Sequence, residues 1–495
     1  MHLPPPRSLA RVRALSASVA LALTTLGAAP ALPVAQAAVL QPTVSDYAFV
    51  ASSETPPTEA QCLAIGRRCF TPQGFWGAYN LNPLYAGGFD GSGVTVAIVD
   101  SYGSDTIAHD LHVFDAAFGL PPMCGEEGVT CAPGMPTFKR ISLQGTPATV
   151  QQPGNGTGLE NKAAWSLEVS LDVESVHSFA PGANILLVTT PTAETLGVQG
   201  FPTMMNAEQY VVDHHMASVI SQSFASTEEA FGSTQSLMNL RHAFVSAAAD
   251  GVTVLGSSGD GGTANGTKTP VRQGGTLIPY PTVNWPASDP LVTGVGGTYL
   301  CTDPASTTAR VVDSTDPPAA CKAHPGVAEV GWVAAGGGFS HVFARPSYQD
   351  SLPAGSTSIG AMRGVPDVAS EASALTGPLV YDTNAGLGGL SNAGSGGWFI
   401  IGGTSVACPQ WAGMVAIADQ INGGGLGLIN PALYKIGSNP TRYANDFFDE
   451  TTGLNQTVAS IPGYPATAGW DPVTGLGSAN AANLLPDLVN AVHGH

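Results

Sequence analysis

The stretch Gly402–Gly413, "GGTSVACPQWAG", places Ser405 directly after the apolar run Trp398–Ile401. The spacing of the apolar residues that follow predicts a buried helix, with Pro409 acceptable because it falls in the first turn. The N–H groups of a first turn and the helix dipole stabilise negative charge next to such a hydroxyl. A serine becomes a nucleophile only with a base within hydrogen-bond reach, however, and the alternative for Gly-Gly-Thr-Ser is an ordinary helix N-cap.

The composition excludes several classes of protein. The chain of 495 residues has 43% hydrophobic residues, too many for a disordered protein, and its 61 Gly and 39 Pro indicate many loops. The formal net charge of −19 argues against nucleic acid as a partner.

The N-terminus has the features of a secretory signal. Arginines precede the apolar stretch Leu15–Leu26, and Ala35-Gln36-Ala37 offers a cleavage site, so we predict a signal peptide over 1–37. No later segment approaches the uninterrupted apolar length of a membrane span. We therefore expect a secreted, extracellular protein with no membrane contact once the signal is removed.

Seven cysteines suggest a disulfide framework, because exported proteins keep disulfides. Proximity in sequence predicts three local pairs and leaves Cys408 unpaired in the helix, where the favoured interpretation is a small core residue. The predicted pairs are Cys62 with Cys69, Cys124 with Cys131, and Cys301 with Cys321.

Short β-branched runs that end in Gly, Ser or Asp predict strands, and helical patterns lie between them. The strands are expected at 93–103, 183–190, 217–223 and 251–262, and the helices at 162–179 and 234–250. Strands buried on both faces that alternate with helices predict an α/β fold with a parallel sheet. Polar residues at the strand ends, among them Asp100, Ser223 and Asp260, would then share one edge. Residues 136–161 and 300–330 are expected to be surface loops.

One predicted helix carries two acids on one face. Glu168 and Asp172 are four residues apart, and Trp165 lies on the same side. When buried, one of two such carboxyls tends to hold a proton. Taken alone, this pair favours a solvated acidic stripe, just as Asp260 in "GSSGDGG" favours a turn residue.

The order of the motifs changes that interpretation. "TVAIVDSYG" (95–103), "VISQS" (219–223), "SSGDGG" (257–262) and "GGTSVACP" (402–409) resemble the subtilisin-like scaffold, but its histidine motif is missing. The segment "EVSLD" (168–172) occupies the place of that histidine motif in the order of motifs. The pattern is similar to the sedolisin family of serine-carboxyl peptidases, in which a Glu and an Asp on one helix replace the histidine and an Asp replaces the oxyanion-hole Asn. Further stretches that fit are 285–298, 336–349, 363–369, 430–434 and 469–480.

The resemblance runs from about 71 to 488 and implies a subtilisin-like three-layer fold, with a central, mostly parallel sheet flanked by helices. It also implies an acyl-enzyme on Ser405, with Glu168 as general base, Asp172 supporting it and Asp260 donating to the oxyanion; Asp100 would extend the network. A carboxylate base suits acidic pH, and an aspartic acid donates only while protonated. We therefore expect an acid-active endopeptidase or tripeptidyl peptidase that acts on polypeptides.

The segments "FFDETTGLN" (447–455) and "ATAGWDPVTG" (466–475) resemble the calcium loop of the family. The resemblance implies one structural Ca²⁺, held by two carboxylates and by backbone carbonyls, which suits a cation that prefers oxygen ligands. The alternative is that these acids cap turns. The carboxylates would come from Asp449 and Asp471, and the carbonyls from Glu450, Thr467 and Gly469.

The predicted organisation leaves little room for the N-terminal prodomain that is usual in the family. Its parts are the signal peptide 1–37, an N-terminal segment 38–70, the peptidase domain 71–488 with the calcium loop 447–475, and a tail 489–495. The alternatives for folding and latency are a chain that folds unaided, a separate folding or inhibitory partner, or inactivity at neutral pH before export.

Two other functions remain open on the sequence. The first is a histidine-based triad of Asp100, Ser405 and one of His109, His112 or His177, although none of these histidines lies in a motif. The second is a secreted, non-catalytic binding protein on a peptidase scaffold. Chemically competent residues at all four key positions argue against the second.

Overall fold

The computed structural model describes residues 46–143, 158–191, 200–266, 276–384 and 396–494, together with the backbone of Gln41 and Pro42. Side chains of the segment that begins at 158 are described from residue 164 onward. The predicted signal peptide 1–37 lies outside these residues. The chain from Gln36 onward forms one unit, and the account below concerns that unit alone.

A central sheet contains the predicted strands. All its neighbouring strands pair in parallel except β10 and β11, so the expected mostly parallel sheet is confirmed. In sheet order the strands are β11 (Glu329–Gly331), β10 (Thr293–Leu300), β8 (Thr253–Ser257), β6 (Val219–Gln222), β3 (Thr95–Ser101), β5 (Asn184–Thr190) and β4 (Phe138–Ser142), and β14 (Val368–Glu371) also pairs with β10.

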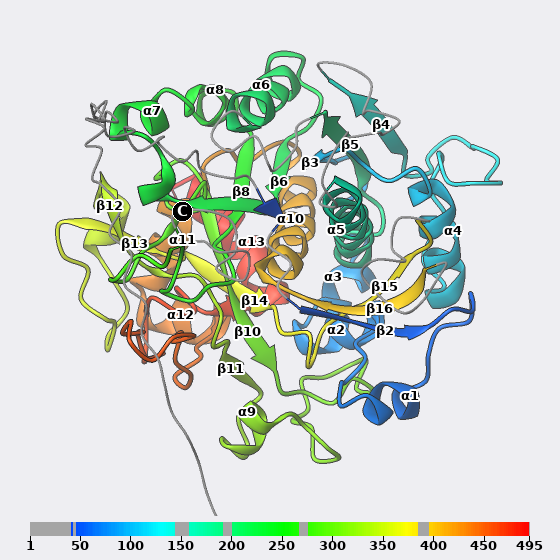
Figure 1. Ribbon diagram of the computed structural model, residues 1–495. Helices are drawn as coiled ribbons and strands as arrows, with labels where there is room; N and C mark the ends of the chain where they lie inside the picture. The colour runs from blue at the N-terminus through cyan, green and yellow to red at the C-terminus, as the bar shows by residue number, and fades with distance from the viewer. Residues whose placement is uncertain are drawn as a thin grey trace, which may run out of the picture. The chain divides into compact units, whose positions relative to one another are not determined.

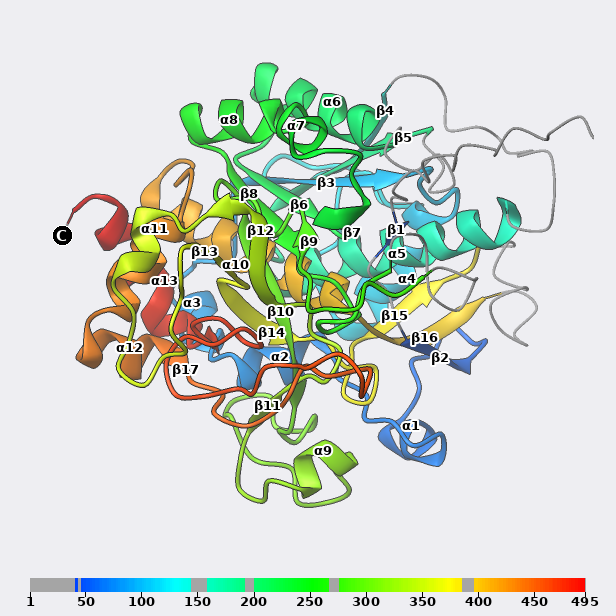
Figure 2. The same cartoon turned by 60° about the vertical axis from the view of Figure 1, so that its left-hand side comes forward.

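Helices cover both faces of this sheet, which gives three layers (Figures 1 and 2). Along β3, Val96 and Ile98 join the core beneath one set of helices, whereas Ala97 and Val99 join the core beneath the other. This alternation follows from the two-residue period of a strand that is buried on both faces. The first set is α5 (Gly158–Phe179), α10 (Thr404–Asn422) and α13 (Ala481–Val492), and the second is α6 (Gly200–Asp213) and α8 (His242–Ala249).

The predicted helix after Ser405 is α10, and it is buried from Thr404 to Asp419. It packs closely against α5 at Gly413, where an added Cβ would come within 2.6 Å of the Phe179 Cβ. Glycine therefore permits the close approach that sets the two helices side by side. Gly423 ends α10 in the left-handed conformation that glycine tolerates best.

Shorter strands surround the central sheet. They form the groups β1 (Gln41–Pro42), β7 (Phe224–Thr227) and β9 (Asn284–Trp285); β2 (Asp46–Ala51), β16 (Gly397–Gly402) and β15 (Leu379–Asp382); β12 (Gly338–Ala344) and β13 (Met362–Val365); and β17 (Phe447–Phe448) and β18 (Ser478–Ala479). The other α-helices are α1 (Glu59–Ala64), α2 (Pro72–Ala78), α3 (Asn82–Ala86), α4 (Ile107–Phe118), α7 (Thr234–Met238), α9 (Ala319–Lys322), α11 (Asn430–Gly437) and α12 (Pro440–Asp446).

Two local expectations are wrong. The helix predicted over 234–250 is divided into α7 and α8, and between them Arg241 donates from Nη2 to Oδ1 of Asp289 at 2.8 Å. The loop predicted over 136–161 contains the edge strand β4, in which Phe138 is buried but Lys139 and Arg140 are exposed. An edge strand with so few buried residues has the polar composition of a loop.

The cysteines pair as their proximity suggests. The disulfides are Cys62–Cys69, Cys124–Cys131 and Cys301–Cys321, and Cys408 is free and buried in α10. The free thiol lies beside β6, with the Ser221 Oγ 3.5 Å from its Sγ.

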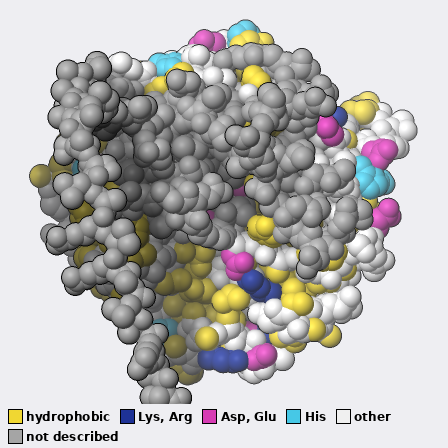
Figure 3. Space-filling model, viewed as in Figure 1, with side chains coloured by type: hydrophobic (Ala, Val, Ile, Leu, Met, Phe, Trp, Pro, Cys, Tyr) yellow, Lys and Arg dark blue, Asp and Glu magenta, His cyan; other side chains and the backbone are white. Residues whose placement is uncertain are grey.

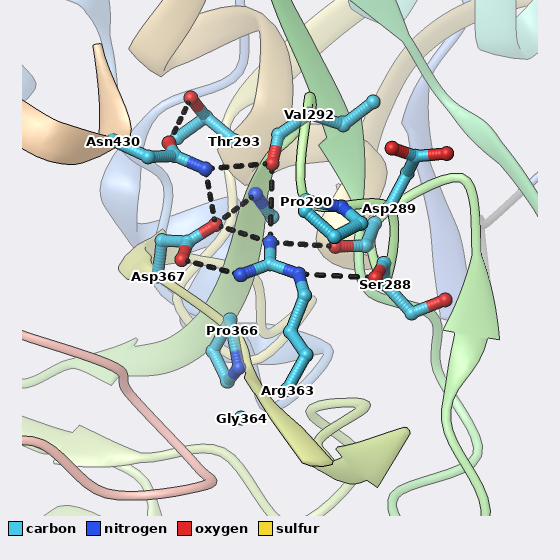
Figure 4. A network of polar contacts seen from close by, with 12 residues as sticks. Ser288, Asp289, Pro290, Val292, Thr293, Arg363, Gly364, Pro366, Asp367 and Asn430 are labelled. Atoms are coloured by element: carbon cyan, nitrogen blue, oxygen red, sulfur yellow. Dashed lines mark hydrogen bonds and ion pairs between the residues drawn. The ribbon is translucent and has the colours of Figure 1, made fainter. Parts of the chain in front are cut away.

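One buried ion pair is completely satisfied (Figure 4). Arg363 donates from Nη2 to Oδ2 of Asp367 at 2.7 Å, and its other N–H groups reach the Tyr348 hydroxyl and backbone carbonyls. Asp367 in turn accepts from the Gly294 N–H and the Tyr434 hydroxyl. All the polar groups of this pair are thus matched, as a buried charge requires.

The face of the molecule in Figure 3 shows Lys and Arg side chains beside Asp or Glu side chains in its lower half. Arg67 with Asp46 and Lys322 with Asp316 are surface pairs of this kind. Within the described ranges, we find no helix that combines the length and the apolar character needed to cross a membrane.

Candidate active site

Two helices and two strand ends bring the predicted catalytic residues together. Glu168 and Asp172 lie on α5, Ser405 lies in the first turn of α10, and Asp100 lies near the end of β3. All four are fully buried. The charges of Asp172, Asp100 and Asp260 all act on Glu168, so the five residues form one electrostatic cluster.

The start of α10 depends on the two glycines before Thr404. An added Cβ on Gly402 would come within 2.1 Å of the Ala374 backbone nitrogen, and Gly403 has a φ of 141°. The Gly403 N–H donates to the Ala372 carbonyl at 2.7 Å. These constraints fix the point at which β16 turns into the helix and therefore the position of Ser405.

Glu168 lies next to the Ser405 hydroxyl. Burial raises the pKa of Glu168 well above its usual range, the charges of Asp172 and Asp100 raise it further, and the Ser405 hydroxyl lowers it. Neither carboxylate oxygen of Glu168 has a partner with full hydrogen-bond geometry in the described part of the chain. Catalytic hydrogen bonds often tighten only when substrate binds. The arrangement therefore offers a carboxylate beside the hydroxyl that it would deprotonate.

Asp172 and Asp100 complete a carboxyl cluster. Asp172 accepts a hydrogen bond from the Ser223 hydroxyl at 2.9 Å, and burial followed by the charge of Asp100 raises its pKa well above the usual range. Burial raises the pKa of Asp100 to about 8, and neither of its oxygens has a hydrogen-bond partner among the described residues. None of the ion pairs in those ranges includes these carboxyls. Such a cluster shares protons between its members.

Asp260 approaches the same helix start from the end of β8. Its Oδ1 accepts from the Thr404 N–H at 2.8 Å and from the Thr404 hydroxyl at 2.9 Å. The Thr404 Oγ1 also accepts from the Gly259 N–H at 2.9 Å. This network places an acid directly beside the residue that precedes Ser405.

Two partners in this cluster were missed at the sequence level. Ser223 was recognised as a strand-end residue but not as a donor to Asp172, and Thr404 was considered only within an ordinary helix N-cap. The signal for Thr404 was its position at the start of the helix, where hydroxyl side chains commonly bond to neighbouring polar groups. Nothing in the local sequence connects Ser223 with Asp172, which are 51 positions apart.

The three histidines of the alternative triad have other partners. His177 lies on α5, and its Nε2 lies 3.0 Å from the Pro121 carbonyl oxygen. The carboxylate partners of His109, His112 and His177 are Glu127, Glu126 and Asp115, at 2.7, 3.2 and 3.1 Å. None of these contacts involves Ser405 or Asp100, so the structure does not support this triad.

The predicted calcium loop brings two carboxylates to one short backbone segment. Asp449 accepts from the Gly469 N–H at 3.1 Å, and Asp471 accepts from the Thr467 N–H at 3.0 Å. Glu450 instead turns its side chain to the Ser478 hydroxyl, 2.9 Å away. In the described ranges no three His, Cys, Asp or Glu side chains gather as a metal site. A site here would therefore need backbone carbonyls, and its donors are the hard oxygens that Ca²⁺ prefers.

No family model matches the chain, but known proteins with similar sequences are found. Kumamolisin of Bacillus sp. (strain MN-32) is 29% identical over 435 residues, which cover 87% of this chain and 66% of the relative. Sedolisin of Pseudomonas sp. (strain 101) is 28% identical and covers 81% of this chain and 59% of the relative. Tripeptidyl-peptidase 1 of Bos taurus is 28% identical and covers 67% and 54%.

The solved structure of Pseudomonas sedolisin, a serine-carboxyl proteinase complexed with two molecules of pseudo-iodotyrostatin, matches with a TM-score of 0.62 and 25% identity. The match covers 85% of this chain and 98% of that one. The chain spans between 54% and 66% of the length of the three curated relatives. By sequence and by fold, the chain is similar to members of the sedolisin family of serine-carboxyl peptidases.

Proposed function

We propose that the chain is a serine-carboxyl peptidase that hydrolyses polypeptides through an acyl-enzyme on Ser405. The observation that carries this proposal is the buried cluster in which Glu168 adjoins the Ser405 hydroxyl and Asp172 adjoins Glu168. Carboxyls are costly to bury without cations, and such arrangements occur where a perturbed pKa is used.

The proposed reaction follows from these positions. Glu168 accepts the Ser405 proton as the oxygen attacks the peptide carbonyl, and the charge of Asp172 increases the basicity of Glu168. Asp260 donates its proton in a hydrogen bond to the oxyanion, as does the N–H of the first turn of α10. The C–N bond then breaks, the amine leaves with a proton returned by Glu168, and water hydrolyses the ester by the same steps.

The same groups give the proposed acid activity. Glu168 must be ionised to accept a proton, whereas Asp260 must be protonated to donate one. Burial and mutual repulsion raise the pKa values of Glu168, Asp172 and Asp100, so the cluster retains protons that its members can share. We expect a bell-shaped profile with its maximum below pH 7.

A pH profile of casein cleavage tests this proposal, with wild type compared with Glu168→Gln and Ser405→Ala. We expect activity confined to acid in wild type and a loss of about 100- to 10,000-fold in Glu168→Gln, the usual contribution of a general base. Asp316→Asn, at an exposed carboxylate, serves as the matched control and should retain full activity. Neutral activity that survives Glu168→Gln would contradict the assignment.

The mode of cleavage is tested on a peptide with a blocked N-terminus. Relatives of the chain include enzymes named tripeptidyl-peptidase, which makes removal of tripeptides the alternative to internal cleavage. An endopeptidase cleaves the blocked peptide, whereas a tripeptidyl peptidase requires the free amine. Mass spectrometry of the products distinguishes the two.

We further propose that one Ca²⁺ stabilises the loop 447–475. The Asp449 and Asp471 carboxylates would bind it, with carbonyls from Glu450, Thr467 and Gly469. A ligand that binds only the folded chain stabilises it by about 3 kcal/mol at 100 times its Kd. Calorimetric titration of chelator-treated protein should therefore show one site that disappears in Asp449→Asn and persists in Asp316→Asn. No heat in the parent chain would refute it.

Finally, we propose that the protein is exported. The predicted signal peptide 1–37 and three disulfides support this location, because disulfides persist in oxidising compartments. Expression with and without residues 1–37 should place the protein outside and inside the cell, respectively.

A further inference from the structure

Thr404 directs two hydrogen bonds at a single oxygen of Asp260. Its backbone N–H donates to Oδ1 at 2.8 Å, and its hydroxyl donates to the same atom at 2.9 Å. The Thr404 hydroxyl oxygen also accepts a hydrogen bond from the Gly259 N–H at 2.9 Å. A hydroxyl has a single proton, so with the Gly259 N–H on its oxygen this proton is directed at Asp260.

The surroundings of Thr404 hold its hydroxyl in this orientation. The residue is fully buried at the start of α10, which packs against β8 and β10 (Figures 1 and 2). A Cβ added to Gly297 of β10 would lie 3.4 Å from the Thr404 methyl group, so the methyl packs against that strand. Because a β-branched side chain has few χ1 rotamers, the methyl contact fixes the direction of the hydroxyl as well.

Gly259 is equally constrained on the other side of this contact. Its φ is 100°, and an added Cβ would come within 2.1 Å of the Asn284 Nδ2. Glycine therefore permits the backbone conformation that presents the Gly259 N–H to the Thr404 hydroxyl. Asn284 in turn donates from Nδ2 to the Ser258 carbonyl at 2.9 Å. The turn that carries Asp260 is thus held in place by the folded chain itself.

The two donors decide which oxygen of Asp260 carries a proton. A carboxylic acid has one O–H, and an oxygen that accepts two hydrogen bonds is the carbonyl oxygen of that acid. The proton of Asp260 is then left on Oδ2, the oxygen that can donate to an oxyanion. The same donors also favour the ionised form, because hydrogen bonds to a carboxylate stabilise its charge. Thr404 therefore directs this proton and also makes it easier to lose.

We propose that Thr404 is a positioning residue of the oxyanion site, which occupies Oδ1 of Asp260 and so reserves Oδ2 as the donor to the substrate oxyanion. This inference rests on the proposed function for the role of Asp260 in the reaction. The hydrogen bonds from Thr404 to Asp260 are a separate property of the folded chain, and they are measurable in protein that has no activity.

Activity across pH tests the role of the Thr404 hydroxyl. Thr404→Val and Thr404→Ala both lack the hydroxyl, and Thr404→Ser is the matched control that keeps it. In the two variants without it, we expect kcat to fall about tenfold with little change in KM. The limb of the profile at high pH should move up by about one pH unit, the effect of losing one hydrogen bond to a charged group. Thr404→Ser should keep the wild-type limb.

Glu168, the titratable neighbour on which the charge of Asp260 acts, is the same in all these proteins and cannot account for a difference between them. A loss of packing alone would lower activity without moving the limb. An unmoved limb in both variants that lack the hydroxyl, or an equal shift in Thr404→Ser, would overturn the proposal.

Titration of Asp260 without catalysis gives an independent test. In Ser405→Ala protein with isotope-labelled aspartate, the carboxyl NMR signal of Asp260 is assigned by its absence when Asp260→Asn is added. We expect its titration midpoint to be about one pH unit higher when Thr404→Ala is added instead. Equal midpoints would overturn the proposal. Absence of hydrolysis in every form would contradict the peptidase assignment and with it the oxyanion role, while the titration would still decide whether Thr404 holds the Asp260 proton.

Discussion

Asp367 and Glu168 are both completely buried carboxylates, but their surroundings differ. Asp367 faces the guanidinium of Arg363 and accepts further hydrogen bonds from the backbone and a tyrosine (Figure 4). Glu168 faces two other buried acids, Asp172 and Asp100, and no described cation. Asp367 has the partners that stabilise a buried charge. Glu168 lacks such partners, so it can gain or lose a proton. The comparison separates a group that supports the fold from groups available for chemistry.

Removing the cation from the satisfied pair should have the largest effect. Arg363→Met leaves Asp367 buried without its partner, so we expect the free energy of unfolding to fall by about 3–5 kcal/mol. Denaturant unfolding measures this change. Arg345→Met is the matched control, because Arg345 forms a partly exposed pair with Asp350, and it should cost less than about 1 kcal/mol. Equal losses of unfolding free energy in the two variants would show that the buried pair of Arg363 is no more important for stability than the exposed pair of Arg345.

The pH dependence of stability gives the next largest effect. In the folded chain the pKa of Asp100 is about 8 and those of Glu168 and Asp172 are also raised, so the folded state holds protons that the unfolded state releases from about pH 4 upward. The contribution of these three carboxyls to the free energy of unfolding should therefore be greatest below about pH 4. It should then fall towards pH 8, by at most about 1.4 kcal/mol per pH unit for each proton. Unfolding measured across this range checks the sign.

Neutralising one member of the cluster should reduce that slope. Glu168→Gln cannot ionise, so at pH 7 we expect it to be more stable than wild type by about 1–2 kcal/mol while it loses activity. Asp316→Asn, a change at an exposed acid, should remain within about 0.5 kcal/mol. A Glu168→Gln protein that is less stable than wild type at neutral pH would show that the carboxylate is compensated by partners after all.

The smallest expected effect concerns Ser223. Its hydrogen bond lowers the pKa of Asp172, so Ser223→Ala should raise that pKa further and move the acidic limb of the activity profile to higher pH. One hydrogen bond to a charged group corresponds to a shift of about one pH unit. An unchanged limb would mean that Asp172 does not control the ionisation of Glu168.

Much of this arrangement was predictable because it depends on local sequence. The period of β3 and the buried pattern of α10 predict elements that the structure confirms, and the close spacing of the cysteines predicts the disulfides. The division of the helix at Arg241 was not predictable, because it depends on Asp289, which is 48 positions away. β4 was missed for a similar reason, since the neighbouring strand β5 decides its pairing.

The candidate site shows the same limit. Resemblance to a family indicates which acids to consider, and the spacing of Glu168 and Asp172 places them on one face of a helix. Whether that face is solvated or enclosed depends on α10 packing against α5 at Gly413, more than 200 positions further along the chain. The choice between a surface stripe and a proton-sharing cluster is therefore a property of the tertiary structure.

The free thiol of Cys408 makes the motion of α10 accessible to a simple chemical assay. Six of the seven cysteines, all of which lie in the described ranges, form disulfides, so Cys408 carries the single free thiol. It is buried against β6, and burial raises its pKa to about 12, so an alkylating reagent can modify it only when α10 separates from the sheet. The labelling rate of this one atom would report how often the segment bearing Ser405 opens in the native protein.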